Sequence, residues 1–255
     1  MRRVALIAVE VLTPLVVILI VLAVTNAGAG FYLPPLQDVL VAFQKNWLFA
    51  RIPTDVLPSL VRLLSGYLIA CALGVALGIL LGRVRWLRRQ AMPVVEFLRA
   101  IPPPALLPFT LVAIGVDSTA KIALIAFVCV WPVLLNTIDG IGGIDPTLRQ
   151  TGQVYRIPRL DSLLHVELRA ASPQILAGMR TSLPLALILM VISEMVASTD
   201  GIGYFIVQSQ RVFAIPDMWS GILLLGILGF LLNGAFTLLE DRALAWHRGA
   251  RAVAR

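Results

Sequence analysis

Six long apolar stretches constrain the fold of this 255-residue chain more than any other feature. A bilayer core about 30 Å thick is crossed by about 20 helical residues, which rise ~1.5 Å each. Each stretch is close to that length and is bounded by charged residues or by proline and glycine clusters. The approximate windows are residues 4–24, 57–82, 91–115, 120–138, 175–197 and 218–239. We therefore predict an all-α, polytopic membrane protein with about six transmembrane helices.

The composition excludes an ordinary soluble enzyme. Hydrophobic residues make up 59% of the chain and charged residues 14%, whereas soluble domains carry ~25% charged residues. So few charges do not cover a water-facing surface, and most of the protein must face lipid. The two cysteines, Cys71 and Cys129, lie in separate apolar stretches. This placement argues against a disulfide scaffold or a cysteine metal site and favours simple packing.

The basic residues predict the topology. Connectors on one side carry fourteen arginines, namely Arg2, Arg3, Arg83, Arg85, Arg88, Arg89, Arg149, Arg156, Arg159, Arg169, Arg242, Arg248, Arg251 and Arg255. Connectors on the other side carry only Lys45, Arg51 and Arg211. Because cytoplasmic loops are enriched in Lys and Arg, both termini are predicted to be cytoplasmic, in the cell inner (plasma) membrane. The same asymmetry explains the net charge of +7 without a nucleic-acid partner.

The chain divides into three parts. Residues 1–30 form a predicted N-terminal transmembrane anchor. A cleaved secretory signal is the alternative, but the apolar run exceeds the ~7–15 residues usual for a signal core. Residues 31–56 are rich in proline and predict an outside (periplasmic) connector with a short helix around 39–47. Residues 57–248 form the transmembrane core, whose longest inside connector is 139–172.

Two spans carry signals about packing and transport. Small residues recur every four positions from Gly66 to Gly82 in the second span, which predicts close helix packing within one subunit rather than a dimer seam. The third span holds prolines at 102, 103, 104 and 108, and proline both lacks an N–H and clashes with the preceding turn. The helix must therefore break there. Broken backbone at membrane depth favours the lining of a transport path, with a structural kink as the alternative.

Besides Glu10 in the first window, six charged residues fall inside the spans. Each costs a few kcal/mol near the bilayer centre unless it pairs, snorkels or faces water. Glu96 and Arg99 lie three residues apart and are predicted to pair. Glu194 is interpreted as a gate residue or a helix cap. Snorkelling is the simpler interpretation for the other three, Arg62, Lys121 and Arg180.

The chain has no recognisable catalytic apparatus. It has no G-x-x-x-x-G-K-[ST] loop, and its only lysines, Lys45 and Lys121, follow no glycine-rich turn. His165 and His247 accompany no zinc or nucleophile motif. We therefore expect a non-catalytic subunit without a metal or cofactor of its own. Any ATP, with its magnesium, must be hydrolysed in a partner subunit.

The longest inside connector predicts a docking element. Residues 147–169 read as two short amphipathic helices separated near Pro158. The first is expected to present Leu148, Thr151, Gly152 and Tyr155 on one side, a spacing that suits a groove on a soluble partner. A solvated loop lying on the lipid headgroups is the alternative interpretation.

Six segments, in order along the chain, resemble a known family. They are FYLPP at 31–35, FLRAIPPPALLP at 97–108, STAKI at 118–122, GMR at 178–180, SEM at 193–195 and GIGY at 201–204. In order and spacing they resemble the permease subunits of ABC importers, in the branch that handles taurine, aliphatic sulfonates, nitrate or bicarbonate. The resemblance implies a permease that pairs with a second copy, most simply as a homodimer. It also implies ATP-binding subunits and a periplasmic or lipoprotein solute-binding protein as partners.

The resemblance also implies roles for residues. Permeases of this kind carry an E-A-A loop and a following glycine, which seat in the ATPase subunit. Here Gln150, Thr151 and Gly152 stand in place of E-A-A, Arg156 stands in place of the glycine, and Arg169 replaces a proline. The residues implied for coupling are Gln150, Thr151, Gly152, Tyr155, Arg156 and Arg159. Those implied for the translocation path or its gate are Arg99, Pro102, Pro103, Pro104, Glu194 and Tyr204.

The predicted function is therefore ATP-driven, binding-protein-dependent import of a small anionic solute such as a sulfonate, nitrate or bicarbonate. Two alternatives remain open. One is a proton-coupled secondary transporter, which would use Glu10, Glu96 or Glu194 as relay carboxylates. The other is a non-transporting, anchoring partner in an asymmetric permease pair, which the departures in the coupling loop favour.

Overall fold

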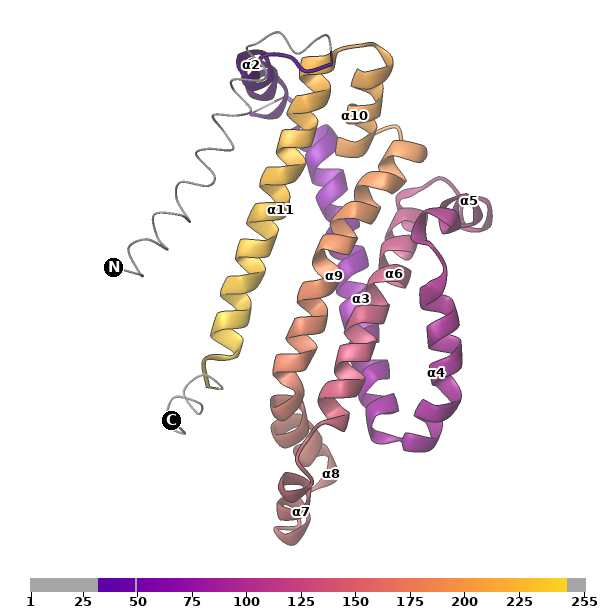
Figure 1. Cartoon of the computed structure of the whole chain (residues 1–255), viewed down its shortest axis with the longest axis vertical. Helices are drawn as coiled ribbons and strands as arrows, with labels where there is room; N and C mark the ends of the chain where they lie inside the picture. The colour runs from indigo at the N-terminus through magenta and orange to yellow at the C-terminus, as the bar shows by residue number, and fades with distance from the viewer. Residues whose placement is uncertain (1–31, 49, 247–255) are drawn as a thin grey trace, which may run out of the picture.

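Four long helices run side by side along the long axis of the protein (Figure 1). The computed structural model describes residues 32–48 and 50–246. Within that part, the helices long and apolar enough to cross a membrane are α3 (Leu57–Arg83), α6 (Ser118–Gly142), α9 (Leu168–Val196) and α11 (Ile215–Ala243). They confirm four of the predicted spans. The first predicted span, 4–24, lies outside the described residues, so six helices and cytoplasmic termini stay predictions.

The core lies where α3, α6 and α9 pack together. Leu63, Ile125, Val133, Ala186 and Met190 are fully buried there. Lipid tails are as apolar as these side chains, so close van der Waals packing must hold such helices together. The small residues of α3 provide it by facing α6. A Cβ at Gly78 would overlap the Cβ and Cγ2 of Thr137 on α6. The prediction that this small face packs within one subunit is confirmed.

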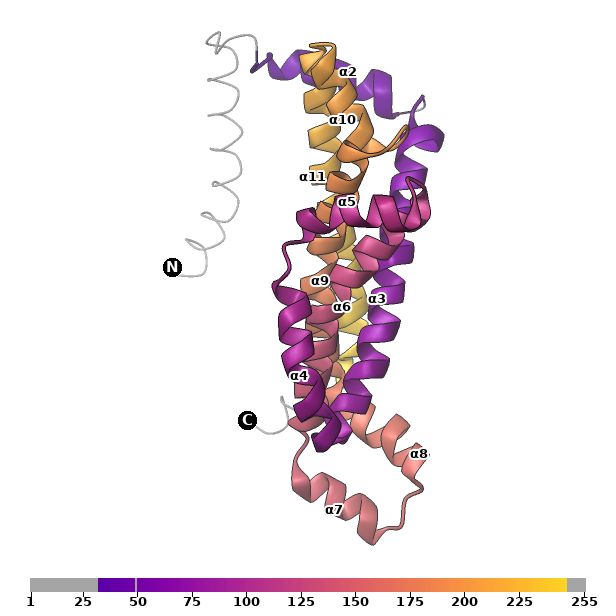
Figure 2. The same cartoon turned by 90° about the vertical axis from the view of Figure 1, so that its right-hand side faces the viewer.

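The third predicted span is broken, as the prolines require. Helix α4 (Arg85–Ala100) runs alongside the core, and α5 (Pro103–Ile114) turns away from it by 93°. Ile101 and Pro102 are extended between the two helices. Pro103 and Pro104 occupy the first turn of α5, where a helix does not use their missing N–H groups. Figure 2 shows α5 lying across the bundle rather than along it.

A hook projects beyond one end of the bundle (Figure 2). We define it as residues 143–161, which include α7 (Pro146–Val154) and α8 (Arg159–Asp161). The two helices separate at Pro158, as predicted. A π-helical segment, η2 (Ser162–Glu167), joins α8 directly to α9, so the helical run begins at Arg159 and not near residue 175. Pro173 is tolerated inside this run because the Ser172 hydroxyl donates to the carbonyl of Arg169, which Pro173 cannot bond.

The opposite end, which we call the far end, is closed by short helices. They are α2 (Leu36–Trp47), the π-helical segment η1 (Ile52–Val56) and α10 (Ile202–Arg211). The predicted short helix at 39–47 is thus confirmed as part of α2. Trp47 Nε1 donates to Ser220 Oγ at 3.0 Å, and Asn46 Nδ2 donates to Asp217 Oδ1 at 2.8 Å. These bonds tie α2 to the start of α11.

Candidate functional site

A buried carboxylate organises the far end. Glu194, near the end of α9, is completely buried. Its carboxylate accepts from Arg62 Nη1 at 2.9 Å, from Ser59 Oγ at 2.8 Å and from the Gly203 N–H at 3.1 Å. A buried charge without partners would be very unfavourable, so these donors are what make Glu194 compatible with the site. Glu194 thus joins α3, α9 and α10.

The Arg62 side chain is the second centre of this network. Its Nη2 pairs with Asp200 Oδ1 at 2.6 Å, and its Nε donates to Ser118 Oγ at 2.9 Å. Burial alone would raise the pKa of Asp200, but the hydrogen bond and charge of Arg62 outweigh it and hold that pKa below its ordinary value. Arg62 therefore links α3 to α6 and to the turn between α9 and α10.

The snorkelling interpretation is wrong for Arg62 and Lys121. Both residues are only 4% exposed. Lys121 Nζ donates to Ser198 Oγ at 2.8 Å in the same turn. Neither side chain extends toward the membrane surface, because the turn after α9 brings hydrogen-bond acceptors close to both of them. Arg180 is different, since its side chain is 47% exposed and pairs with Glu240 at 3.1 Å.

The turn between α9 and α10 fits only glycine at position 201. Gly201 has φ +107°, and a Cβ there would overlap the carboxylate of Glu194. Its N–H donates to Asp55 Oδ1 at 3.0 Å, and the next N–H, of Ile202, donates to Ser59 Oγ at 3.0 Å. We name the network of Asp55, Ser59, Arg62, Lys121, Glu194 and Asp200 the far-end clamp.

Sequence reasoning missed half of the far-end clamp. Asp55, Ser59 and Asp200 were not singled out, although Ser59 and Arg62 lie three residues apart on one face of α3. Next to the clamp lies a cavity of about 540 Å³. Its lining includes Arg62, Asp117, Lys121 and Asp200, so it carries both signs of charge.

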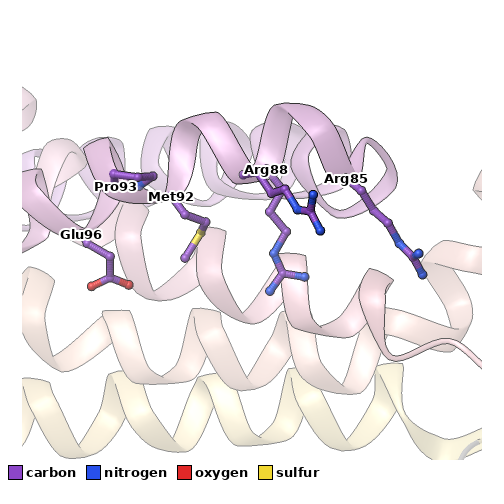
Figure 3. A pocket seen from close by; sticks show the side chains of 6 residues that line it. Arg85, Arg88, Met92, Pro93 and Glu96 are labelled. Atoms are coloured by element: carbon purple, nitrogen blue, oxygen red, sulfur yellow. The ribbon is translucent and has the colours of Figure 1, made fainter.

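A second, open groove, of about 630 Å³, follows one face of α4, which supplies all of its lining residues (Figure 3). We define the α4 stripe as the residues that share this face at spacings of three or four, namely Arg85, Arg88, Arg89, Met92, Glu96 and Arg99. In Figure 3 the side chains of Arg85, Met92 and Glu96 leave α4 on the same side. The predicted pair is confirmed, with Arg99 Nε 2.6 Å from Glu96 Oε2.

The predicted path residues do not gather in one place. Arg99 ends the α4 stripe, and the three prolines form the turn into α5. Glu194 lies in the far-end clamp, and Tyr204 is half-buried on α10. Neither the cavity nor the groove above is lined by these prolines, Glu194 or Tyr204. Their role in a path therefore stays a prediction.

The hook presents almost all of the predicted coupling residues to solvent. Gln150, Thr151, Arg156 and Arg159 are exposed, and Tyr155 is 77% exposed. Gly152 is the exception, because it faces inward toward Ser162 of η2. The predicted face of Leu148, Thr151, Gly152 and Tyr155 is therefore exposed except at Gly152.

Helix α7 begins with a cap that the sequence provides locally. The carboxylate of Asp145 accepts from the Thr147 N–H at 2.8 Å, and Pro146 occupies the first helical position. This hydrogen bond lowers the pKa of Asp145. The helix ends at Val154 with Tyr155 as its C-cap, and Arg156 then adopts φ +50°. The left-handed backbone at Arg156 lies at the position where the resemblance implies glycine, the residue that adopts it without strain.

The comparisons with known proteins agree with this architecture. Residues 74–244 match the family described as the binding-protein-dependent transport system inner membrane component. The chain belongs to this family. It is therefore a multi-pass, non-catalytic membrane component of a transport system. The predicted resemblance is confirmed.

Relatives of this permease family carry the names expected from the predicted branch. A Bacillus subtilis chain named as an aliphatic sulfonates transport permease is 30% identical over 92% of this chain and 86% of its own length. A nitrate import permease of Leptolyngbya laminosa is 34% identical over 74% of this chain and 68% of its own length. A bicarbonate transport system permease of Synechococcus elongatus is 34% identical over 75% and 66%.

A solved structure supports the permease fold. An inward-facing form of the MetNI methionine ABC transporter contains a chain that superposes with a TM-score of 0.64 at 19% identity. The match covers 74% of this chain and 94% of that one. The likeness concerns the fold alone.

The resemblance leads to a first prediction, for Gly152→Ala. It implies alanine at this position, and a Cβ here would meet only Ser162 Oγ at an ordinary 3.9 Å. Because alanine is the better helix former, we expect the free energy of unfolding to rise by about 0.5–1 kcal/mol. Detergent-solubilised protein in a denaturant titration measures it. Gly140→Ala in α6 is the control and should not stabilise, since its Cβ would lie 3.0 Å from Gln174 Cβ.

A second prediction concerns Arg156→Gly. A left-handed backbone costs an L-residue about 1 kcal/mol, so glycine should raise the free energy of unfolding by about that amount. The same titration checks it. Arg159→Gly removes an equal charge at the start of α8 and should bring no gain, since it places glycine in a helix. A loss of stability in Arg156→Gly would show that its side chain matters more than its backbone.

Proposed function

We propose that this permease is one of two copies, most simply identical, that surround the path of an ATP-driven importer for a small anion. A solute-binding protein delivers the solute on one side. Separate ATPase subunits, which hold ATP and magnesium, bind the hook on the other. The chain itself moves solute and transmits force, and it performs no chemistry.

The hook is the observation that carries this proposal. It stands beyond the end of the apolar bundle (Figure 2), yet large apolar side chains in it are exposed. Val154 is 79% exposed, Tyr155 77% and Leu160 65%. Such side chains on a short helix outside the membrane-spanning bundle favour docking in a groove of a soluble partner.

The connections of the hook suit the transmission of force. It follows α6 directly and leads through η2 into α9, and both helices pack in the core with α3. The far end of α9 carries Glu194, which the far-end clamp ties to α3 and α10. A displacement of the hook can therefore move two packed helices together instead of bending a loop.

An anionic solute is supported by the charges of α4 and by the relatives. The α4 stripe contains four arginines and one glutamate. Three of these arginines, Arg85, Arg88 and Arg89, lie in the connector predicted to be cytoplasmic, where an excess of cations favours anions near that end of a path. The named relatives transport, by their names, a sulfonate, nitrate and bicarbonate.

The carboxylates give little support to proton coupling. Glu96 is paired with Arg99, and Glu194 is enclosed by three donors. A relay carboxylate must be able to exchange its proton with the path. Glu10 lies outside the described residues.

Uptake by reconstituted vesicles tests the proposal. The chain is reconstituted with its ATPase and binding protein, and uptake is driven either by ATP or by a proton gradient. We expect uptake with ATP alone. Tyr155→Ala should reduce it at least about tenfold, since a buried aromatic anchor contributes 1.4 kcal/mol or more to an interface.

The matched control is Phe230→Ala on α11, where the aromatic ring is 78% exposed. It should leave uptake and assembly unchanged. Uptake driven by the proton gradient alone would overturn the proposal, and normal uptake by Tyr155→Ala would remove the hook from the coupling mechanism.

A further inference from the structure

Helix α2 lies across the far end of the bundle. It is seen end-on in Figure 1 and lengthways in Figure 2, so its axis is roughly perpendicular to the long helices. The side chains of Asn46 and Trp47, in its last turn, donate hydrogen bonds to the first turns of α11. Just before α2, the carbonyl of Tyr32 accepts from Trp219 Nε1 at 2.9 Å. Both ends of α2 are therefore held at the level where α11 begins.

The start of α11 sets the depth of α2 in the membrane. Helix α11 has 29 residues, and a helix of that length is about 43 Å long, more than the ~30 Å of a bilayer core. The apolar window of α11 is 218–239, so Asp217 lies just outside it and Ser220 just inside it. Because α2 is bonded to both residues, it lies at the boundary between the hydrocarbon core and the lipid headgroups. Trp and Tyr are enriched at this boundary, which agrees with Trp47, Trp219 and Tyr32.

One side of α2 is packed against the protein. The ring of Trp47 meets the ring of Phe205 on α10 edge-on, with 4.8 Å between the ring centroids. Both rings belong to an apolar cluster that includes Ile202 of α10 and Leu224 of α11. This side of α2 consists of its buried residues, Val39, Ala42, Asn46 and Trp47.

The other sides of α2 separate apolar from charged residues. Leu36 and Leu40 lie one turn apart on one flank, whereas Asp38 and Lys45 lie two turns apart on the opposite flank. Leu40 is 50% exposed, and Val41, on the face away from the bundle, is 66% exposed. A helix with protein on one side, leucines on a second and charges on a third fits a boundary between lipid and water.

The exposed apolar side chains continue from α2 toward a membrane-spanning helix. Leu48 after α2, Ile52 in η1, and Leu57 and Val61 in the first turns of α3 are all about half exposed. Helix α3 is long and apolar enough to cross the membrane, so lipid is the environment of its exposed apolar side chains. The apolar surface of α2 is thus continuous along the chain with a surface that faces lipid.

We propose that α2 is an interfacial helix, and that its Leu36–Leu40 flank is inserted into the lipid leaflet at the far end. Asp38 and Lys45 face the water. Helices of this kind bury their apolar side about 5–10 Å into the boundary between headgroups and acyl chains. Because Trp47 packs on Phe205, this insertion holds α10 at a fixed height relative to the membrane surface. Residues 36–47 are therefore a membrane anchor and not a connector that crosses water.

Electron paramagnetic resonance measures the depth of each flank. Leu40→Cys and Lys45→Cys, each in the full chain in phosphatidylcholine nanodiscs, carry a nitroxide spin label. Oxygen concentrates in lipid and nickel ethylenediaminediacetate in water, so the ratio of the two collision rates reports depth. Leu231→Cys, within the apolar window of α11, is the reference for lipid, and Val154→Cys in the hook is the reference for water. The two native thiols are buried and do not react.

We expect the oxygen-to-nickel ratio at Leu40→Cys to be at least about fivefold that at Lys45→Cys, because only the first flank lies in the apolar layer. Leu36→Cys and Asp38→Cys provide a second pair with the same expected order, in case one of the first two variants does not fold. The measurement needs no ATPase and no solute, so its result is independent of ATP-driven uptake.

Two results would overturn the proposal. Equal or reversed ratios on the two flanks would place both in the same medium, or the charged flank in lipid. Low collision rates with both reagents at Leu40→Cys would show that protein covers this flank, whether another part of the chain or a second copy.

Discussion

Glu194→Ala is expected to lower the free energy of unfolding by about 3–5 kcal/mol, the usual effect of removing one partner from a buried ion pair. The reason is the environment of Arg62, which is 4% exposed and would keep only Asp200 as a counter-charge. The Gly203 N–H would lose its acceptor as well, and Ser59 Oγ would keep only the carbonyl of Asp55. Denaturant unfolding of the purified chain in detergent micelles measures the change.

Glu96→Ala is the matched control. Its ion pair with Arg99 is as short as 2.6 Å, but both side chains are 47% exposed. Exposed pairs contribute about 0–1 kcal/mol, so this variant should unfold almost like the parent. Similar losses in the two variants would show that burial of the clamp is not what makes Glu194 important. Glu194→Gln should lie between them, because the amide oxygen still accepts hydrogen bonds.

Gly78→Ala is expected to lower the free energy of unfolding by about 1–3 kcal/mol, as overpacking of a tight interface does. The added methyl group would overlap Thr137 on α6, and the carbonyl of Leu134 would lie 3.0 Å away. Neither neighbour moves easily. Thr137 is fully buried and its hydroxyl donates to the carbonyl of Val133, while the carbonyl of Leu134 belongs to the α6 backbone. Helix α3 must therefore move away from α6.

Gly226→Ala serves as the control for the contact between α3 and α6. Gly226 lies within α11, and a Cβ there would meet no atom within 4 Å. The substitution improves helix propensity and should be neutral or stabilising by up to about 1 kcal/mol. Equal destabilisation in both variants would refute the close approach of α3 and α6. The comparison is read from the same unfolding titration.

The elements that were predicted correctly depend on short-range patterns. Twenty apolar residues specify a membrane helix wherever they lie, so α3, α6, α9 and α11 were predictable within a few residues at most of their ends. The break before Pro103 follows from the missing N–H of proline, and the two short helices of the hook were predicted from their amphipathic pattern and Pro158. The family resemblance depended on order and spacing in the same way.

The start of α9 was less predictable, because two signals indicate a later start than the structure shows. Pro173 normally marks the beginning of a helix, and the apolar window begins after it. The Ser172 hydroxyl bonds to the carbonyl of Arg169 instead, and the helix continues back to the hook. The side chain of Ser172, one residue before the proline, thus allows the helix to begin earlier than predicted.

The sequence by itself determined that this chain is a helical membrane protein of the permease family, where four of its spans lie and which segment forms the hook. Those properties follow from local periodicity, proline chemistry and the order of motifs. Only the tertiary structure decided that Arg62 and Lys121 are buried, and that Arg62 pairs with Glu194, 132 residues away. Spacing along a chain does not say which carboxylate reaches which cation. That depends on how closely α3, α6 and α9 pack, and on the turn at Gly201.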